Sequence, residues 1–119
     1  MKKIISRLVG FEKEQTARRW LEKQGIQIVA QNFTCKGGEI DLIGLDQDTL
    51  VAFEIRYRKH PRHGNAAESI TPAKLARLQR CLAYFLLRHP NYAHRPLRID
   101  AILFEGQRAP RWLKNISGF

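Results

Sequence analysis

The sequence predicts an α/β domain in which helices flank a central mixed sheet, in the order α-β-β-β-α-β with or without a short final strand. Two long segments carry apolar residues at helical spacing, and short apolar runs bounded by Gly, Pro and Asp lie between and after them. A chain of 119 residues that is 44% hydrophobic can bury one core but not two independent ones. We therefore expect a single domain over residues 1–119.

The first helix is predicted over about residues 6–24, where apolar positions recur at helical spacing and Gly25 follows the last turn. Glu14 lies on the apolar stripe, three residues after Phe11 and three before Ala17, so its carboxylate is expected to face the protein. An acid in an early helix turn is also favoured by the helix dipole alone. The pattern leaves both interpretations of Glu14 open.

Three strands are predicted after this helix. Residues 26–29 form the first strand and lead into a looser segment over 30–34. The second and third strands, at about 39–45 and 50–58, flank a polar turn at 46–49. So short a connection makes these two strands antiparallel neighbours.

The second and third strands carry acids inside apolar runs. Because side chains alternate along a strand, Glu39 and Asp41 share one face, as do Glu54, Arg56 and Arg58. A buried carboxylate is unfavourable unless it is paired, hydrogen-bonded or bound to a metal. Magnesium prefers such hard oxygen ligands. The sequence therefore predicts a divalent-metal site formed by Asp41 and Glu54 and assisted by Glu39 or Glu14.

The remaining elements are a second helix and its following strands. Thr71 and Pro72 supply a cap and a first-turn proline for this helix, which ends near His89-Pro90. The apolar run over residues 97–104 predicts a further strand, and a short last strand is predicted over residues 111–116.

The two cysteines, Cys35 and Cys81, lie in unrelated contexts without C-x-x-C spacing, so we expect neither a zinc site nor a disulfide. No run approaches the length of a membrane span, and the first residues lack the long apolar core of a signal peptide. The expected location is cytoplasmic, with no membrane partner.

The chain is strongly basic, with 21 Lys and Arg against 11 Asp and Glu and a formal net charge of +10. Such an excess attracts polyanions, of which nucleic acid is the commonest, although basic proteins of other function show the same balance. The cationic residues expected to bind nucleic acid gather at the end of the third strand, in the loop after it and on the second helix: Arg58, Lys59, Arg62, Lys74 and Arg77.

The acids resemble the pattern of the PD-(D/E)xK nuclease superfamily, in which an acid on one strand precedes E-x-K on the next and a Glu lies on an upstream helix. Glu14, Asp41 and Glu54 match these three places. More closely, the chain resembles the YraN family, small bacterial proteins similar to archaeal Holliday junction resolvases. The segments that carry this resemblance are Gly38-Glu39-Ile40-Asp41-Leu42-Ile43 and Phe53-Glu54-Ile55-Arg56-Tyr57-Arg58, supported by Asn32, Lys74, Arg98-Ile99-Asp100 and residues 115–119.

The resemblance implies a restriction-endonuclease-like fold and Mg²⁺- or Mn²⁺-dependent hydrolysis of phosphodiesters. It implies Glu14, Asp41, Glu54 and Arg56 as the catalytic residues. It also implies DNA as the partner, with branched DNA as the preferred form, and a homodimer as a weaker expectation.

Two positions depart from the family pattern: Arg56 stands where the family has Lys, and Lys13 stands where it has Gly. Arg stays protonated, so proton transfer at this position would be lost, whereas electrostatic stabilisation of a phosphate would be partly kept. A third interpretation is that Arg56 only holds Glu54 or Glu39 in a salt bridge. Lys74 is the preferred substitute for the missing lysine; the other interpretation of Lys74 is a solvent-facing basic residue that contacts DNA phosphate or nothing. The alternative function is therefore a non-catalytic DNA-binding module that retains the nuclease fold.

Overall fold

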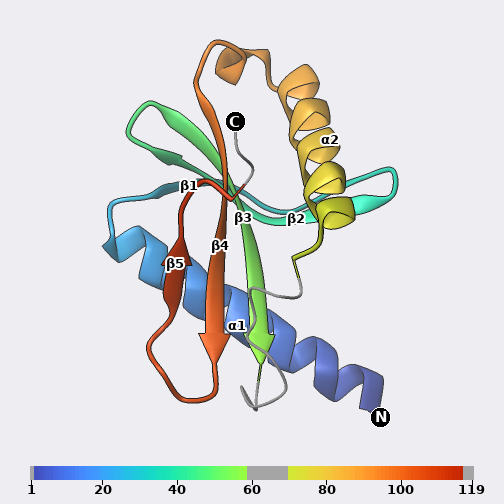
Figure 1. Cartoon of the computed structure of the whole chain (residues 1–119), viewed down its shortest axis with the longest axis vertical. Coiled ribbons are helices and arrows are strands. Elements are labelled where there is room, and N and C mark those ends of the chain that lie inside the picture. The colour runs from blue at the N-terminus through green and yellow to red at the C-terminus, as the bar shows by residue number, and fades with distance from the viewer. Residues whose placement is uncertain (1, 59–69, 117–119) are drawn as a thin grey trace.

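The computed structural model describes residues 2–58 and 70–116, with side chains from residue 12 onward. Helices α1 (Lys2–Lys23) and α2 (Pro72–Arg88) pack on opposite faces of one five-stranded sheet (Figure 1). A short 3₁₀ turn, η2 (Pro90–Tyr92), follows α2. This mixed sheet between two helices is consistent with a restriction-endonuclease-like fold, and the predicted fold class is confirmed.

The strands lie in the sheet in the order in which they occur in the chain. Three of the four neighbouring pairs are antiparallel, and β3 with β4 is the parallel pair. A parallel pair needs a long crossover, and α2 lies within it. The strands are β1 (Gln27–Cys35), β2 (Gly38–Asp46), β3 (Thr49–Arg58), β4 (Leu97–Glu105) and β5 (Arg111–Leu113).

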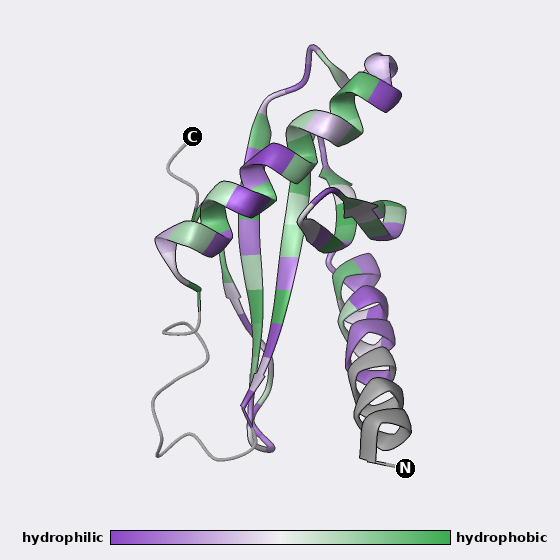
Figure 2. Cartoon of the chain, turned by 90° about the vertical axis from the view of Figure 1, so that its right-hand side faces the viewer, coloured by the Kyte–Doolittle hydropathy of each residue, from purple (hydrophilic) through white to green (hydrophobic). Residues whose placement is uncertain are grey.

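Each face of the sheet has its own apolar core. Leu82 and Phe85 of α2 pack with Ala52 on one face, which we call the α2 core. Ala17 and Leu21 of α1 pack against the other face, which we call the α1 core. Figure 2 shows hydrophobic and hydrophilic residues alternating along α2 and along the coloured part of α1, because each helix covers the sheet with one side and meets solvent with the other. No helix in the described part of the chain is long and apolar enough to span a membrane.

Most elements lie where the sequence predicts them, and the differences have physical causes. The segment over 30–34, predicted to be loose, is part of β1, because it pairs with β2 as far as Cys35 opposite Gly38. The last strand ends at Leu113. Asn115 then takes a positive φ of 56°, and its backbone N–H donates to a side chain of β4 instead of to a neighbouring strand.

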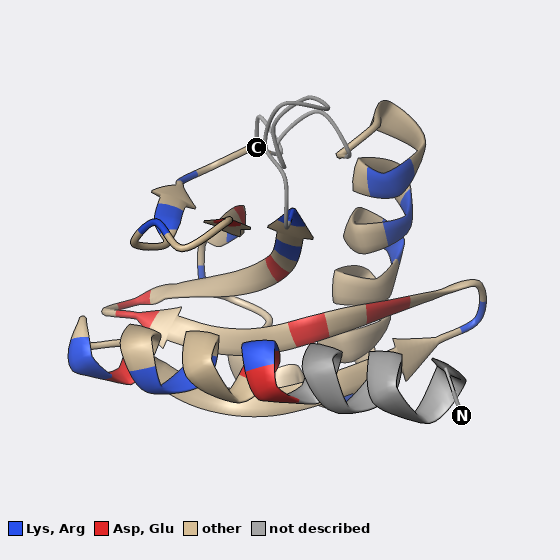
Figure 3. Ribbon diagram, turned by 90° about the horizontal axis from the view of Figure 1, so that it is seen from below, with Lys and Arg blue, Asp and Glu red and all other residues tan. Residues whose placement is uncertain are grey.

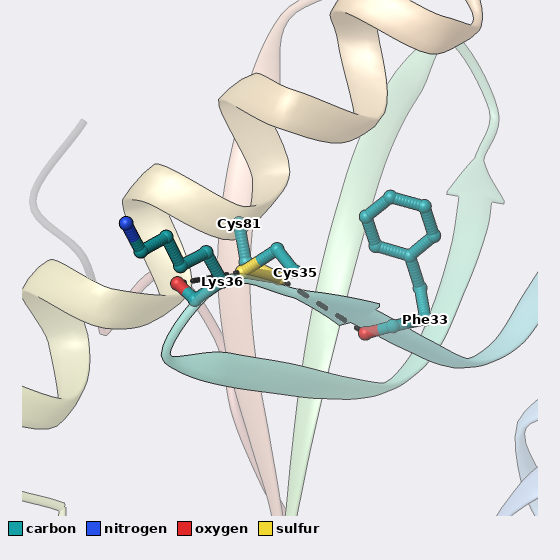
Figure 4. The surroundings of a disulfide bond; sticks show 4 residues. All are labelled: Phe33, Cys35, Lys36 and Cys81. Carbon is teal, nitrogen blue, oxygen red and sulfur yellow. Dashed lines mark hydrogen bonds between the residues drawn. A yellow bond between two sulfur atoms is a disulfide. The ribbon is translucent and has the colours of Figure 1, made fainter.

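The prediction that the two cysteines stay unpaired is wrong: Cys35 at the end of β1 and Cys81 on α2 form a disulfide (Figure 4). Their Cα atoms are 5.5 Å apart, within the usual range for such a bond. Spacing rules missed the pair because the two residues are 46 positions apart and meet only when α2 packs over β1. The bond fixes the β1–β2 hairpin to α2.

Candidate functional site

The candidate site forms where β2 and β3 separate. The two strands pair from Asp46 opposite Thr49 to Leu42 opposite Phe53, and their pairing ends there. Beyond this point the backbone N–H of Ile55 donates to a side chain of β2, to Asp41 Oδ2 at 2.9 Å, and not to a backbone carbonyl of that strand. The side chain of Asp41 is therefore held between the two diverging strands.

The same position breaks the alternation of side chains along β2. Regular alternation places Ile40 and Leu42 on one face, but Ile40 packs in the α2 core and Leu42 in the α1 core. The residue between them is Asp41. The irregularity lets an acid of an interior strand point along the sheet toward other polar groups.

Three carboxylates from two elements gather here. Glu14 of α1 and Glu39 and Asp41 of β2 each offer an oxygen, and these oxygens all lie within 4.8 Å of one another. Figure 3 shows the acidic segments of α1 and β2 side by side. We call Glu14, Glu39 and Asp41 the acid cluster. Glu14 therefore faces the body of the protein, which is the first of the two interpretations that its place in the sequence allowed.

Asn32 of β1 links two members of the acid cluster. With its amide nitrogen turned toward the acids, it donates to Glu14 Oε2 at 2.9 Å and to Glu39 Oε1 at 3.0 Å. It has a positive φ of 54°, a conformation that asparagine tolerates better than most residues. Sequence reasoning did not assign Asn32 to the site, and its only signal was its place in the family resemblance.

Lys13, one of the two departures from the family pattern, helps to place α1. Its ammonium nitrogen lies 4.9 Å from the ring centre of Tyr57 on β3 and 5.4 Å from that of Phe104 on β4. Such cation–π contacts stabilise modestly at partly exposed positions. They hold the turn of α1 that carries Glu14 against the sheet.

Glu54 lies beside the acid cluster but is paired differently. It is 8% exposed, and its Oε1 accepts from Arg56 Nη2 at 2.7 Å. Of the three interpretations of Arg56, the salt bridge to Glu54 is thus formed. Among the buried polar side-chain atoms of the described residues, Arg56 Nε alone has no hydrogen-bond partner.

A small hollow of about 110 Å³ connects this ion pair with α2. Lys74 and Arg77 line it together with Glu39, Glu54 and Arg56, and the Gly37-Gly38 turn closes one side. The predicted substitute Lys74 therefore shares a hollow with two acids. Arg58 is exposed at the end of β3, while Lys59 and Arg62 lie outside the described residues.

Burial and the charge of neighbouring acids raise the pKa values of three carboxyl groups at the site, those of Asp41, Glu14 and Glu54. Burial above all, and then the charge of Glu54, raises the pKa of Asp41 to about 7, although the Ile55 N–H opposes the shift. Burial and the neighbouring Glu39 raise the pKa of Glu14, and the Asn32 amide opposes this. Burial raises the pKa of Glu54 against the influence of Arg56.

This donor set fits a divalent cation. Oxygen ligands suit Mg²⁺ and Mn²⁺, and a cation would offset the burial and the repulsion that raise the pKa values of Asp41 and Glu14. Of the predicted ligands, Asp41 and Glu39 lie together with Glu14, while Glu54 is engaged by Arg56.

A five-stranded mixed sheet between two helices, with acids where two strands separate, defines this chain as a restriction-endonuclease-like α/β protein. The chain belongs to the uncharacterised protein family UPF0102, whose model matches residues 13–104. The match includes all of the acids described above and confirms the relationship to YraN proteins that the sequence indicated.

Several bacterial UPF0102 proteins are similar to the chain over most of their length. The protein of Alcanivorax borkumensis is 46% identical over 110 residues, which cover 89% of this chain and 88% of the relative. That of Neisseria gonorrhoeae is 43% identical over 109 residues, or 92% of this chain and 94% of the relative. That of Pseudomonas putida is 41% identical over 110 residues, or 89% of each chain.

Proposed function

We propose that this protein binds nucleic acid and that its acid cluster holds Mg²⁺ or Mn²⁺ for phosphodiester hydrolysis. The observation that carries the proposal is the convergence of Glu14, Glu39 and Asp41, with oxygens within 4.8 Å of one another where β2 and β3 separate. A protein that gathers three acids, two of them partly buried, around one amide donor destabilises its own metal-free state. A bound cation reverses that cost.

The chemistry that a bound divalent cation supplies is polarisation of a phosphate oxygen and activation of water at neutral pH. The residues of this chain do the rest. Asp41, held by the Ile55 N–H, and Glu39 and Glu14, held by Asn32, stay fixed in orientation before substrate arrives. Preorganisation of this kind reduces the cost of binding and of reaction.

Arg56 and Lys74 serve as electrostatic partners for the scissile phosphate. Both line the same hollow as Glu39 and Glu54. The N–H group at Arg56 Nε donates no hydrogen bond to any of the described residues. A guanidinium binds phosphate well but does not give up its proton. Arg56 thus stabilises negative charge, and Lys74 is the residue able to transfer a proton.

Nucleic-acid binding rests on the basic excess of the chain and on the cations near the site. Lys74 and Arg77 lie at the edge of the acidic site on α2, and Arg58 is exposed on β3. Contacts of this kind to phosphates give an affinity that falls steeply with salt. A homodimer, a preference for branched DNA and a cytoplasmic location stay predictions.

A second candidate is a nucleic-acid-binding protein that has lost catalysis. The observation that favours it is the ion pair between Glu54 and Arg56, with Oε1 and Nη2 2.7 Å apart. Glu54 is the acid of the family's E-x-K pattern, and in this pair its carboxylate is bound by Arg56. In this case metal binding weakens or disappears, while binding to nucleic acid stays.

The experiment is a cleavage assay with branched, duplex and single-stranded DNA in Mg²⁺ and in Mn²⁺, together with calorimetric titration of each metal. Asp41→Ala should abolish cleavage and weaken metal binding. Asp48→Ala is the matched control, because Asp48 is an exposed acid in the turn of the same hairpin. Cleavage that appears only after Arg56→Lys supports the second candidate. Absence of metal binding by the unmodified protein overturns the proposal.

A further inference from the structure

Away from the acid cluster, two open hollows adjoin each other between β1 and α2. The first, of about 440 Å³, is lined by Lys36, Arg80 and Tyr84 together with Thr34 and Cys35. The second, of about 540 Å³, extends along β1 and reaches Arg88 and His89 at the end of α2. Thr34 and Tyr84 line both hollows, so the two form one groove, which we call the β1–α2 groove.

The groove is basic. Lys36 and Arg80 lie at one end and Arg88 at the other, all three side chains are exposed, and no acid lines either hollow. Within residues 12–58 and 70–116, none of these three cations forms a salt bridge. Cations at both ends of a groove, and not gathered at one point, suit several phosphates of a polyanion better than one small anion.

Tyr84 stands in the middle of the groove with an accessible ring. It is 40% exposed, although it packs against Phe33 with ring centres 5.9 Å apart. Arg88 fixes it further: its Nη1 donates to the tyrosine hydroxyl at 3.1 Å, and its guanidinium lies 5.8 Å from the ring centre. An exposed aromatic ring held in place between cations is the arrangement on which unpaired bases stack.

The groove also leads to the acid cluster. Asn32 lines the second hollow, and its amide donates to Glu14 and Glu39. The groove runs along β1, the strand at the edge of the sheet, whose outer side is not covered by another strand in the described structure. An extended chain lying there would thus continue from Tyr84 toward the candidate metal ligands.

We propose that the β1–α2 groove binds a single-stranded segment of nucleic acid, with a base stacked on Tyr84 and phosphates at Lys36, Arg80 and Arg88. The bases of an intact duplex are stacked on one another and do not reach such a ring, so single strands are favoured. This inference rests on the proposed function and adds to it the form of the substrate: a single-stranded segment next to the phosphodiester at the acid cluster.

The test measures fluorescence anisotropy of a labelled thymidine oligonucleotide and of a labelled blunt-ended duplex without a loop at several salt concentrations. Tyr84→Ala should weaken binding of the single strand about five- to a hundred-fold, from the usual contribution of one stacked base. Tyr84→Phe keeps the ring and should bind nearly as the unmodified protein does. Duplex affinity should change less than two-fold in both variants.

Charge reversal tests the phosphate contacts. Arg80→Glu should weaken single-strand binding and reduce its salt dependence by about one released counterion. Arg108→Glu is the matched control, because Arg108 is exposed in the turn before β5, at the opposite edge of the sheet. Circular dichroism and thermal unfolding verify that each variant is folded, and Arg88→Glu replaces any variant that is not.

The outcomes separate the two proposals. If the unmodified protein binds duplex but not the single strand, or if Tyr84→Ala binds the single strand as tightly as before, the groove proposal is overturned and the proposed function stands. If the unmodified protein binds neither probe at low salt, both are overturned. Equal loss of duplex and single-strand binding in Tyr84→Ala also overturns the groove proposal.

Discussion

Asp41 and Asp100 are acids of two interior strands, β2 and β4, which lie on either side of β3, and their surroundings are opposite. Asp100 on β4 is fully buried and accepts from the Arg98 guanidinium, from Trp112 Nε1 at 2.8 Å and from the Asn115 N–H at 2.8 Å. Asp41 on β2 accepts from one backbone N–H, and its charged neighbours are chiefly other acids.

The difference separates a structural carboxylate from one suited to bind something. Asp100 is neutralised by Arg98, which also donates to Asp46 at 2.7 Å, and it fixes the chain after β5 to the sheet. Burial lowers the pKa of Arg98, but its hydrogen bonds to Asp100 and Asp46 outweigh this and raise it. Among the described residues no cation pairs with Asp41, so burial and the neighbouring acids favour its protonated form.

The largest effect is expected for Asp100→Ala. The change removes the acceptor of the Trp112 indole N–H and of the Asn115 N–H and leaves Arg98 with Asp46 alone, and should cost about 3 to 5 kcal/mol of unfolding free energy. Urea unfolding followed by tryptophan fluorescence measures it. Asp48→Ala, in the exposed turn, should change stability by less than about 0.5 kcal/mol. If Asp100→Ala and Asp48→Ala lowered the free energy of unfolding equally, the structural role assigned to Asp100 would be wrong.

A bound divalent metal should stabilise the folded protein through the other acid, Asp41. At a concentration a hundred times the dissociation constant, Mg²⁺ or Mn²⁺ should stabilise the unmodified protein by about 2.7 kcal/mol. The gain should be unchanged in Asp48→Ala and absent in Asp41→Asn. Thermal unfolding with and without chelator measures it. A gain of the same size in Asp41→Asn would place the metal elsewhere.

Without metal, Asp41→Asn should stabilise the protein. The folded state holds a proton on Asp41 up to about pH 7, whereas the unfolded chain releases it near 3.8, so stability falls as pH rises between these values. Asn keeps an acceptor for the Ile55 N–H and removes the charge, and should add about 1 to 3 kcal/mol at pH 8. Denaturant unfolding in chelator at pH 5 and pH 8 tests this. A variant less stable than the unmodified protein at pH 8 would contradict it.

The smallest effect is expected for Asn32→Gly, which keeps the positive φ and removes the amide that donates to Glu14 and Glu39. Metal-free stability at pH 8 should fall by about 0.5 to 1.5 kcal/mol, the usual contribution of a hydrogen bond. The loss should shrink at pH 4, where Glu14 is protonated in larger part. A loss independent of pH would assign Asn32 a purely structural role.

Local patterns predicted the elements well because they record local physics. Helical spacing, the Thr71-Pro72 start and the short turn between β2 and β3 are properties of neighbouring residues, and the structure has α2 and the hairpin where they indicate. The acids of β2 and β3 stood out because they interrupt apolar runs. The family resemblance added a catalytic role for Glu14 and the restriction-endonuclease-like form of the α/β fold.

What the sequence could not predict depends on distant residues. The separation of β2 and β3 at Asp41, the bridge from Asn32 to two acids and the Cys35–Cys81 pair all arise from packing between elements. The role of Asp100 could not be predicted for the same reason. The Arg98-Ile99-Asp100 segment does not indicate that Trp112 and Asn115, which follow β4 in the chain, donate hydrogen bonds to Asp100.

The Cys35–Cys81 disulfide turns the middle of the chain into a covalent ring that contains β2, β3 and the start of α2. One peptide bond cut anywhere between these cysteines opens the ring without releasing a fragment. Such a nicked molecule keeps its full mass on a non-reducing gel and divides into two pieces only when a thiol is added. Limited proteolysis of this protein must therefore be followed under reducing conditions, or the cut will not be seen.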